Sequence, residues 1–281
     1  MNEGVTDWQP RLVALDIDGT ILKWIEGSGV TREEISPAVK DAVRRAVDAG
    51  AHVVLASGRS PHGMTNVADV LELSGADRDR VWVVASNGAV VFRYPPLEVV
   101  HEETFDARPA VEAILARHPS ALVAVEERGV GYRVTSHFPD GELSGDMIVT
   151  DVDDLLATEV SRVIIRDPES TADEFVALAG ELGLHGTSYV VGWTAWLDLA
   201  PVGVSKASGL DFVAGKLGLT AADALAVGDG RNDLEMFAWA RRGVAMGQAI
   251  EDVLAAADDV TASVYEDGLA LELDRWFGDT R

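Results

Sequence analysis

The 281-residue sequence contains no cysteine, and aromatic residues make up only 6% of it. Without cysteine, the chain can form neither a disulfide nor a metal site built on thiolates. Lysine is also scarce, since only 4 of the 23 basic residues are lysines and the others are arginines. A lysine beside a cluster of acidic residues is therefore mildly informative in this chain.

Positive charge is in short supply: 47 acidic residues against 23 basic ones give a formal net charge of −24. Such a field repels phosphate backbones and anionic lipid surfaces, so we expect no nucleic-acid partner and no membrane partner. No apolar run approaches the roughly 18 residues of a membrane-spanning helix, and residues 1–10 lack a secretion signal. We therefore expect a cytoplasmic protein.

What is present is an alternation of strand and helix patterns. Apolar strand-length runs at 12–15, 52–56, 81–85 and 224–227 are separated by helical patterns, of which two open with Ser-Pro at Ser36 and Ser60. This order is typical of βαβ units and a parallel sheet. Within residues 89–199, strands joined by short turns suggest antiparallel hairpins. A helix is expected at 172–182 and one strand at 189–199. The sequence thus predicts an α/β fold, a Rossmann-like parallel-sheet core (1–88 and 200–281) with an inserted α+β cap domain (89–199).

Acidic and polar residues follow three of the predicted core strands. Asp16 and Asp18 end the first strand, Ser57 the second, and Asp229 and Asp233 follow the strand at 224–227. Open α/β sheets place ligands at the carboxyl ends of their strands. Converging carboxylates form a hard-oxygen site that suits Mg²⁺. Taken singly, each feature also fits an ordinary acidic turn.

Lys206 follows the predicted cap and begins a helical pattern. Together with Ser57 and nearby backbone N–H groups, it could neutralise phosphate oxygens. Taken on its own, Lys206 is better explained as a solvated residue on a helix. The sequence has no G-x-G-x-x-G after its first strand, no P-loop and no nucleophile elbow, which argues against dinucleotide, P-loop and α/β-hydrolase chemistry.

Six short motifs together resemble those of one family: DIDGT (16–20), ASGR (56–59), SNGA (86–89), VSKASGL (204–210), GDGRND (228–233) and AMGQA (245–249). The chain is similar to the haloacid dehalogenase-like (HAD) hydrolases, in the branch of Cof-type sugar-phosphate phosphatases with a type IIB cap. The resemblance extends over nearly the whole chain beyond the first ten residues.

The resemblance implies a role for each matching residue. Asp16 would be the nucleophile that becomes an aspartyl phosphate, and Asp18 the general acid and base. Asp16, the Asp18 carbonyl oxygen and Asp229 would hold Mg²⁺. Asp233 would bind the metal through water or orient Lys206. Ser57, Lys206 and Asn232 would bind the phosphoryl group of the substrate.

The reaction implied is hydrolysis of a small phosphorylated metabolite. A phosphomutase of similar architecture remains an alternative, because such mutases keep both aspartates. A non-catalytic phospholigand sensor is the competing class, although the presence of Asp16 and Asp18 weighs against it. The sequence names neither the substrate nor the oligomeric state. Candidate cap contacts are Arg128, Tyr132, Arg133, Trp193 and Trp196.

Overall fold

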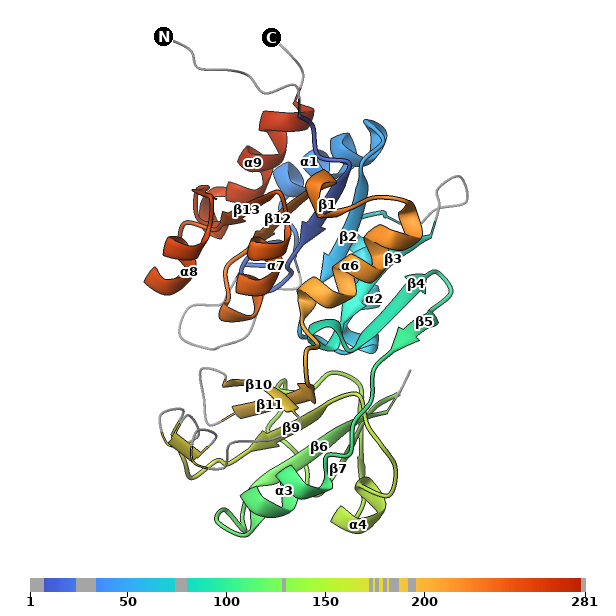
Figure 1. Cartoon of the computed structure of the whole chain (residues 1–281), viewed down its shortest axis with the longest axis vertical. Coiled ribbons are helices and arrows are strands. Elements are labelled where there is room, and N and C mark those ends of the chain that lie inside the picture. Colours follow the sequence, from blue (N-terminus) through green and yellow to red (C-terminus); the bar gives the residue numbers. More distant parts are fainter. Residues whose placement is uncertain are drawn as a thin grey trace.

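The computed structural model describes residues 8–23, 34–73, 80–127, 130–171, 187–191 and 196–278, and the single positions 174, 177, 178 and 181. The described chain forms two sheets, one above the other in Figure 1, each with its own helices. The predicted α/β core with a second α+β part is confirmed.

The larger sheet has eight strands, of which six are parallel and two at one edge are antiparallel. Its order is β14 (Asp259–Val260), β13 (Arg242–Ala245), β12 (Ala224–Gly228), β1 (Leu12–Leu15), β2 (His52–Ala56), β3 (Val81–Ala85), β4 (Val90–Tyr94) and β5 (Glu98–Glu102). The strand at the centre, β1, is buried at every position, as its apolar run predicts.

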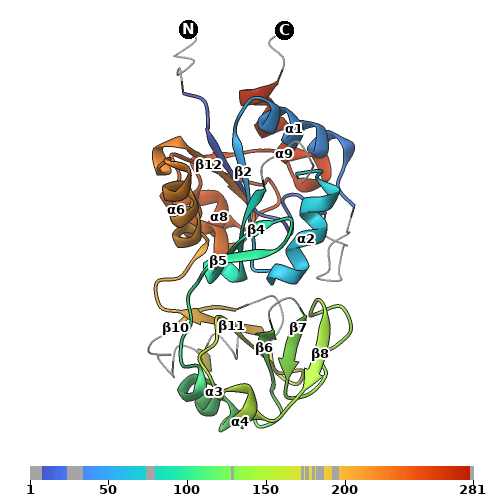
Figure 2. The ribbon, with the colours of Figure 1, turned by 90° about the vertical axis from the view of Figure 1, so that its right-hand side faces the viewer.

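Helices cover both faces of this sheet (Figures 1 and 2). Alternate residues of β1 enter two separate hydrophobic clusters, Val13 and Leu15 in one, Leu12 and Ala14 in the other. The first cluster includes α1 (Pro37–Asp48), α2 (Pro61–Val70) and α9 (Gly268–Phe277); the second includes α6 (Lys206–Leu217), α7 (Leu234–Trp239) and α8 (Glu251–Ala256). The core is therefore a three-layer sandwich that holds β1 rigidly.

The Ser-Pro pairs begin helices, as predicted. The Ser36 hydroxyl accepts a hydrogen bond from the Val39 N–H at 3.2 Å, and Pro37 is the first residue of α1. Ser60 caps α2 in the same way, with Pro61 following it. Proline suits this position because the first N–H of a helix has no partner within the helix.

The smaller sheet has six strands in the order β10 (Thr187–Val191), β11 (Trp196–Pro201), β9 (Val163–Arg166), β6 (Leu122–Glu127), β7 (Gly131–Val134) and β8 (Asp146–Val149). One face packs against α3 (Arg108–Leu115) and α4 (Val152–Leu155), through a cluster that includes Val123, Ile165 and Leu197. These helices lie on the side away from the core, so the opposite face of the sheet is turned toward the core (Figure 1).

Two details differ from the expectation. Residues 90–102, which the sequence analysis placed in the insertion, pair as β4 and β5 with the edge of the core sheet. Their antiparallel pattern marks an edge hairpin on the parallel sheet, so by sheet membership the insertion begins after Glu102 and extends to Pro201. The single strand expected at 189–199 is instead part of an antiparallel pair, β10 and β11.

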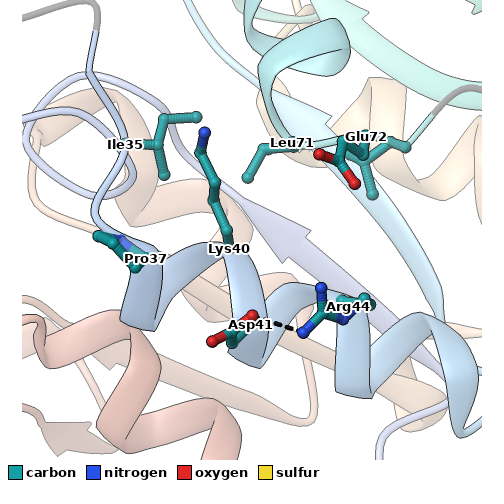
Figure 3. Close-up of a pocket in the computed structure, with 8 residues that line it drawn as sticks. Ile35, Pro37, Lys40, Asp41, Arg44, Leu71 and Glu72 are labelled. Atoms are coloured by element: carbon teal, nitrogen blue, oxygen red, sulfur yellow. Dashed lines mark hydrogen bonds and ion pairs between the residues drawn. The ribbon is translucent and has the colours of Figure 1, made fainter.

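The helix expected at 172–182 falls largely outside the described residues. None of the helices in the described part of the chain combines the length and apolarity that crossing a bilayer requires. A hollow of about 180 Å³ lies between α1 and the end of α2. Figure 3 shows Lys40 reaching between Ile35 and Leu71, while Asp41 pairs with Arg44 on the same helix. None of the predicted site residues lines this hollow.

Candidate active site

The predicted site residues come together at the carboxyl edge of the core sheet. β12, β1 and β2 are neighbours, and their ends deliver Asp229, Asp16 and Ser57 respectively. This edge faces the smaller sheet (Figure 1). The arrangement follows from parallel pairing, since consecutive β-α units return their strand ends to one edge.

Lys206 lies at the centre of this group. It is the first residue of α6, and its side chain is fully buried. Its Nζ donates to Oδ1 of Asp16 and to Oδ1 of Asp233, each at 2.6 Å. Burial acts to lower the pKa of Lys206, but the two carboxylates outweigh that effect and raise it. Lys206 is therefore a fixed positive charge beside Asp16, and its interpretation as a solvated helix residue is wrong.

Asp16 is buried in an acidic environment. Burial raises the pKa of Asp16 well above its usual range, and Asp233, Asp229 and Asp18 raise it further, while Lys206 opposes them. Neighbouring anions make a carboxylate harder to ionise. One lysine does not balance this cluster, so an additional cation would stabilise the ionised form of Asp16.

The acidic cluster fits a divalent cation. Asp16, Asp229 and Asp233 each offer one carboxylate oxygen, and these oxygens lie within 4.8 Å of one another. Asp233 is already engaged at both oxygens, because Oδ1 accepts from Lys206 and Oδ2 accepts from the backbone N–H groups of Asp229 at 2.9 Å and Gly230 at 2.8 Å. These contacts favour the prediction that Asp233 orients Lys206.

Asp18 lies two residues beyond Asp16 but has a different environment. Arg59 forms a two-pronged pair with it, from Nε to Oδ2 at 2.9 Å and from Nη2 to Oδ1 at 2.7 Å. The backbone N–H of Arg59 also donates to the Ser57 hydroxyl at 3.1 Å. Arg59 therefore links the loop that carries Ser57 to the carboxyl group predicted to be the acid.

Asn232 is brought to the same edge by the turn after β12. Its Nδ2 donates to Oδ1 of Asn87 at 3.0 Å, and the backbone N–H of Asn87 donates to the Ser57 carbonyl oxygen at 3.1 Å. The side-chain amide of Gln248 donates to the Gly19 carbonyl oxygen at 2.7 Å and to Oδ2 of Asp229 at 3.2 Å. All seven predicted residues thus lie at this edge, in two hydrogen-bonded sets, one around Lys206 and the other around Arg59 and Asn87.

Three residues of this group received no role from the sequence: Arg59, Asn87 and Gln248. Each lies within a motif that the sequence analysis had noted, ASGR, SNGA and AMGQA. Their partners are far away in the chain, so only the fold reveals the contacts. The only local sign of these residues is that each is a polar residue within a short motif that follows a strand.

The candidate cap contacts have varied environments. Tyr132 is buried and its hydroxyl accepts from Arg162 at 3.3 Å. Trp196 packs edge-on against Phe138, as a packing residue would. Arg133 pairs with Glu127. Arg128 and Trp193 lie outside the described residues.

Comparison with known proteins identifies the family to which a chain with this fold and this group of residues belongs. A model of the haloacid dehalogenase-like hydrolase family matches residues 13–273. The chain therefore belongs to that family. Several relatives that match nearly all of the chain are named as phosphatases, and the chain is a phosphatase, a phosphoric monoester hydrolase.

A phosphoglycolate phosphatase of Natronomonas pharaonis is 30% identical over 263 residues, which cover 94% of this chain and 96% of that protein. A chloroplastic endoribonuclease, YBEY of Arabidopsis thaliana, is 26% identical and matches 98% of this chain. The chain spans only 48% of the length of that protein.

Among solved structures, one described as the HAD subclass IIB sugar phosphatase BT4131 aligns with a TM-score of 0.77. The two are 23% identical, and the alignment covers 94% of this chain and 98% of the other. This likeness supports the fold, a HAD core with a cap.

Proposed function

We propose that this phosphatase hydrolyses small phosphate monoesters, sugar phosphates above all, through an aspartyl phosphate on Asp16 and with Mg²⁺ bound. The observation that carries the proposal is the pair of Lys206 and Asp16, joined at 2.6 Å beside two further carboxylates. The lysine holds one oxygen of a carboxylate at the strand end, and a second acid, Asp18, follows two residues later.

In the first step, an oxygen of Asp16 forms a bond to phosphorus while the bond from phosphorus to the leaving oxygen breaks. Asp18 transfers its proton to that leaving oxygen. In the second step, water attacks the phosphorus of the aspartyl phosphate and gives its proton to the Asp18 carboxylate. The bond between phosphorus and Asp16 breaks, and inorganic phosphate leaves.

Lys206, Ser57 and Asn232 would hold the oxygens of the phosphoryl group during both steps. Such positioning and charge stabilisation account for most of the catalysis of phosphoryl transfer. Asp16, Asp229 and the Asp18 carbonyl oxygen would hold the Mg²⁺. The ion supplies positive charge that offsets the charge of the phosphoryl oxygens. Asp233 would act through Lys206 and the turn at Asp229.

Charge and architecture favour a small substrate. The net charge of −24 opposes large polyanions, whereas one phosphoryl group can be bound by a local cation and Lys206. The six-stranded sheet faces the edge of the core that carries the site (Figure 1), so a substrate would bind between two parts of one chain, an arrangement that suits a compact leaving group. Phosphoglycolate phosphatase and sugar phosphatase, the names of two relatives, both refer to small phosphorylated molecules. The cytoplasm is the expected compartment.

The test measures phosphate release from a panel of phosphate esters with and without Mg²⁺. We expect turnover that disappears when the metal is chelated and returns when it is restored. Asp16→Asn should abolish turnover because an amide is a poor nucleophile, and Asp18→Asn should slow it by about a hundredfold or more because proton transfer is lost. Asp41→Asn, on an exposed helix surface, is the matched control and should keep normal rates.

Mass spectrometry of the quenched wild-type reaction should show one added phosphoryl group, absent from Asp16→Asn. Near-normal turnover by Asp16→Asn, with deamidation excluded by mass, would disprove the covalent route. Conversion of one phosphate ester to another without phosphate release would indicate the phosphomutase alternative. Binding without any turnover would indicate the sensor.

A further inference from the structure

The loop between β3 and β4, residues Ser86–Gly88, has an unusual backbone. Three consecutive residues have positive φ, 51° at Ser86, 52° at Asn87 and 104° at Gly88. Only glycine adopts this region without a cost, and a non-glycine residue there costs on the order of 1 kcal/mol or more. Strain of this kind persists where the surrounding contacts require it, so the contacts of this loop are informative.

The loop is fixed in place by close packing on two sides. A Cβ added to Gly88 would lie 2.0 Å from the Ser205 carbonyl oxygen, just before Lys206. A Cβ added to Gly58 would lie 3.1 Å from Oδ1 of Asn87. The loop therefore lies between the segment that carries Ser57 and the beginning of α6.

Asn87 connects this packed region to the smaller sheet. Its Oδ1 accepts from Asn232 at 3.0 Å, and its Nδ2 donates to Oδ2 of Asp198 in β11 at 3.2 Å. Ser86 adds a second link, as its hydroxyl donates to Oε2 of Glu126 in β6 at 2.6 Å. One amide thus joins the predicted phosphate ligand Asn232 to the cap.

Asp198 is itself held firmly. Arg162 donates from Nε to Oδ1 at 2.8 Å and from Nη2 to Oδ2 at 2.7 Å, and both side chains are buried. A carboxylate that receives a guanidinium in this way can only accept a hydrogen bond from Asn87. The NH₂ group of Asn87 must then face Asp198, and its carbonyl oxygen must face Asn232.

The same logic orients Asn232. Because Asn87 presents an acceptor, Asn232 must present its NH₂ group, of which one N–H is used. The second N–H of that amide is left for a phosphoryl oxygen. The orientation of Asn232 is therefore determined by a chain of hydrogen bonds that begins at Arg162 in the cap.

We propose that Asn87 is a positioning residue that makes the phosphate affinity of the site depend on the docked cap, by orienting Asn232 through Asp198. The proposal rests on the function proposed above. It predicts that the phosphate ligands are complete only while the cap is seated, so that binding of the phosphoryl group and cap docking strengthen each other.

The test measures the affinity for inorganic phosphate in the presence of Mg²⁺ by calorimetry, which requires no turnover. Inorganic phosphate has no leaving group, so contacts between the cap and a leaving group do not enter the result. Asn87→Gly removes the amide and keeps a backbone that tolerates positive φ. We expect about a tenfold or greater loss of affinity, as for a hydrogen bond to a charged group.

Asn232→Ala should cause a similar loss, and the double variant should lose little more, because both changes remove the same interaction. Asp198→Asn should weaken phosphate binding in the wild-type background and have little effect once Asn87 is glycine. The matched control is Glu72→Gly, which also replaces a non-glycine residue of positive φ, 54°, away from the site. It should leave phosphate affinity unchanged.

Unchanged phosphate affinity in Asn87→Gly would overturn the proposal, as would losses in Asn87→Gly and Asn232→Ala that simply add. Thermal unfolding of each variant identifies losses that come from a damaged fold. Failure of the wild type to hydrolyse any ester would instead overturn the proposed function. The phosphate titrations would still report on Asn87 in that case.

Discussion

At the scale of single residues, the candidate site combines groups that local motifs place at strand ends with others that only the fold connects. Asp16, Asp18 and Asp229 could be predicted because each follows a strand in a motif. The contacts of Asn87 with Asp198 and of Arg59 with Asp18 join residues 111 and 41 positions apart, which no local pattern reveals.

Glu126 has an unusual environment at this scale. Burial raises its pKa to about 7, with Asp198 and Glu102 adding to the effect and Arg162 and the Ser86 hydroxyl opposing it. Its Oε1 is shielded from solvent and has no hydrogen-bond partner in the described part of the protein. A neutral carboxyl group suits this position better than an ionised one.

The raised pKa predicts how stability changes with pH. Between the pKa of the unfolded chain, about 4.3, and about 7 in the folded protein, the folded state binds the additional proton. The free energy of unfolding should therefore fall as pH rises through this window, by at most about 1.4 kcal/mol per pH unit from this group. Above the window the contribution stays constant.

Urea unfolding of wild type and Glu126→Gln between about pH 5 and pH 8 checks this prediction. The glutamine variant cannot ionise, so its stability relative to wild type should rise with pH. Glu127→Gln, the adjacent residue of β6 that pairs with Arg133, is the matched control. Parallel pH profiles for wild type and Glu126→Gln would contradict the assignment.

At the scale of elements, local signals were sufficient for most of the core. The caps at Ser36 and Ser60 and the apolar runs of the parallel strands predict their elements directly. The sequence pattern places the edge hairpin of β4 and β5 in the insertion because short turns replace the strand–helix alternation after Gly88. Which sheet a hairpin joins depends on pairing with strands that are distant in the sequence. The local pattern of the hairpin does not predict that pairing.

The close approach of the loop at 86–88 to α6 leads to a prediction for Gly88. An alanine there would bring its Cβ to within 2.0 Å of the Ser205 carbonyl oxygen in a backbone with φ of 104°. We expect a loss of about 2 to 4 kcal/mol in the free energy of unfolding, from overpacking and backbone strain together. Turnover should also fall under conditions in which the variant remains folded, because the displaced segment leads into Lys206.

Gly218→Ala provides the control. Gly218 also has a positive φ, 67°, but no atom lies within 4 Å of an added Cβ. It should lose about 1 to 2 kcal/mol from strain alone and keep its activity. Urea unfolding and turnover, measured where both variants are folded, separate the two effects. Equal losses of activity would show that the packing against Ser205 is unimportant.

At the scale of the whole molecule, the net charge of −24 surrounds a site that must admit an anion. Lys206 between two carboxylates and Arg59 beside Asp18 offset part of this charge locally, and the proposed Mg²⁺ would supply the remainder. Beyond the site, the field of the protein still repels an approaching phosphate ester. Association should therefore be slower at low ionic strength, where this repulsion is least screened.

This repulsion gives the last prediction. With saturating Mg²⁺, kcat/KM for a dianionic monoester should increase by about two- to tenfold as salt rises from about 10 mM to 150 mM, because the Debye length shortens from about 30 Å to 8 Å. The value of kcat should change little, since the bound ester already lies within the local field of Lys206. A phosphorylated oligonucleotide should remain a poorer substrate and show a steeper salt dependence. If kcat/KM for the small ester instead fell with salt, attraction by the local cations would determine the rate of association. The net charge of the protein would then not explain a preference for small substrates.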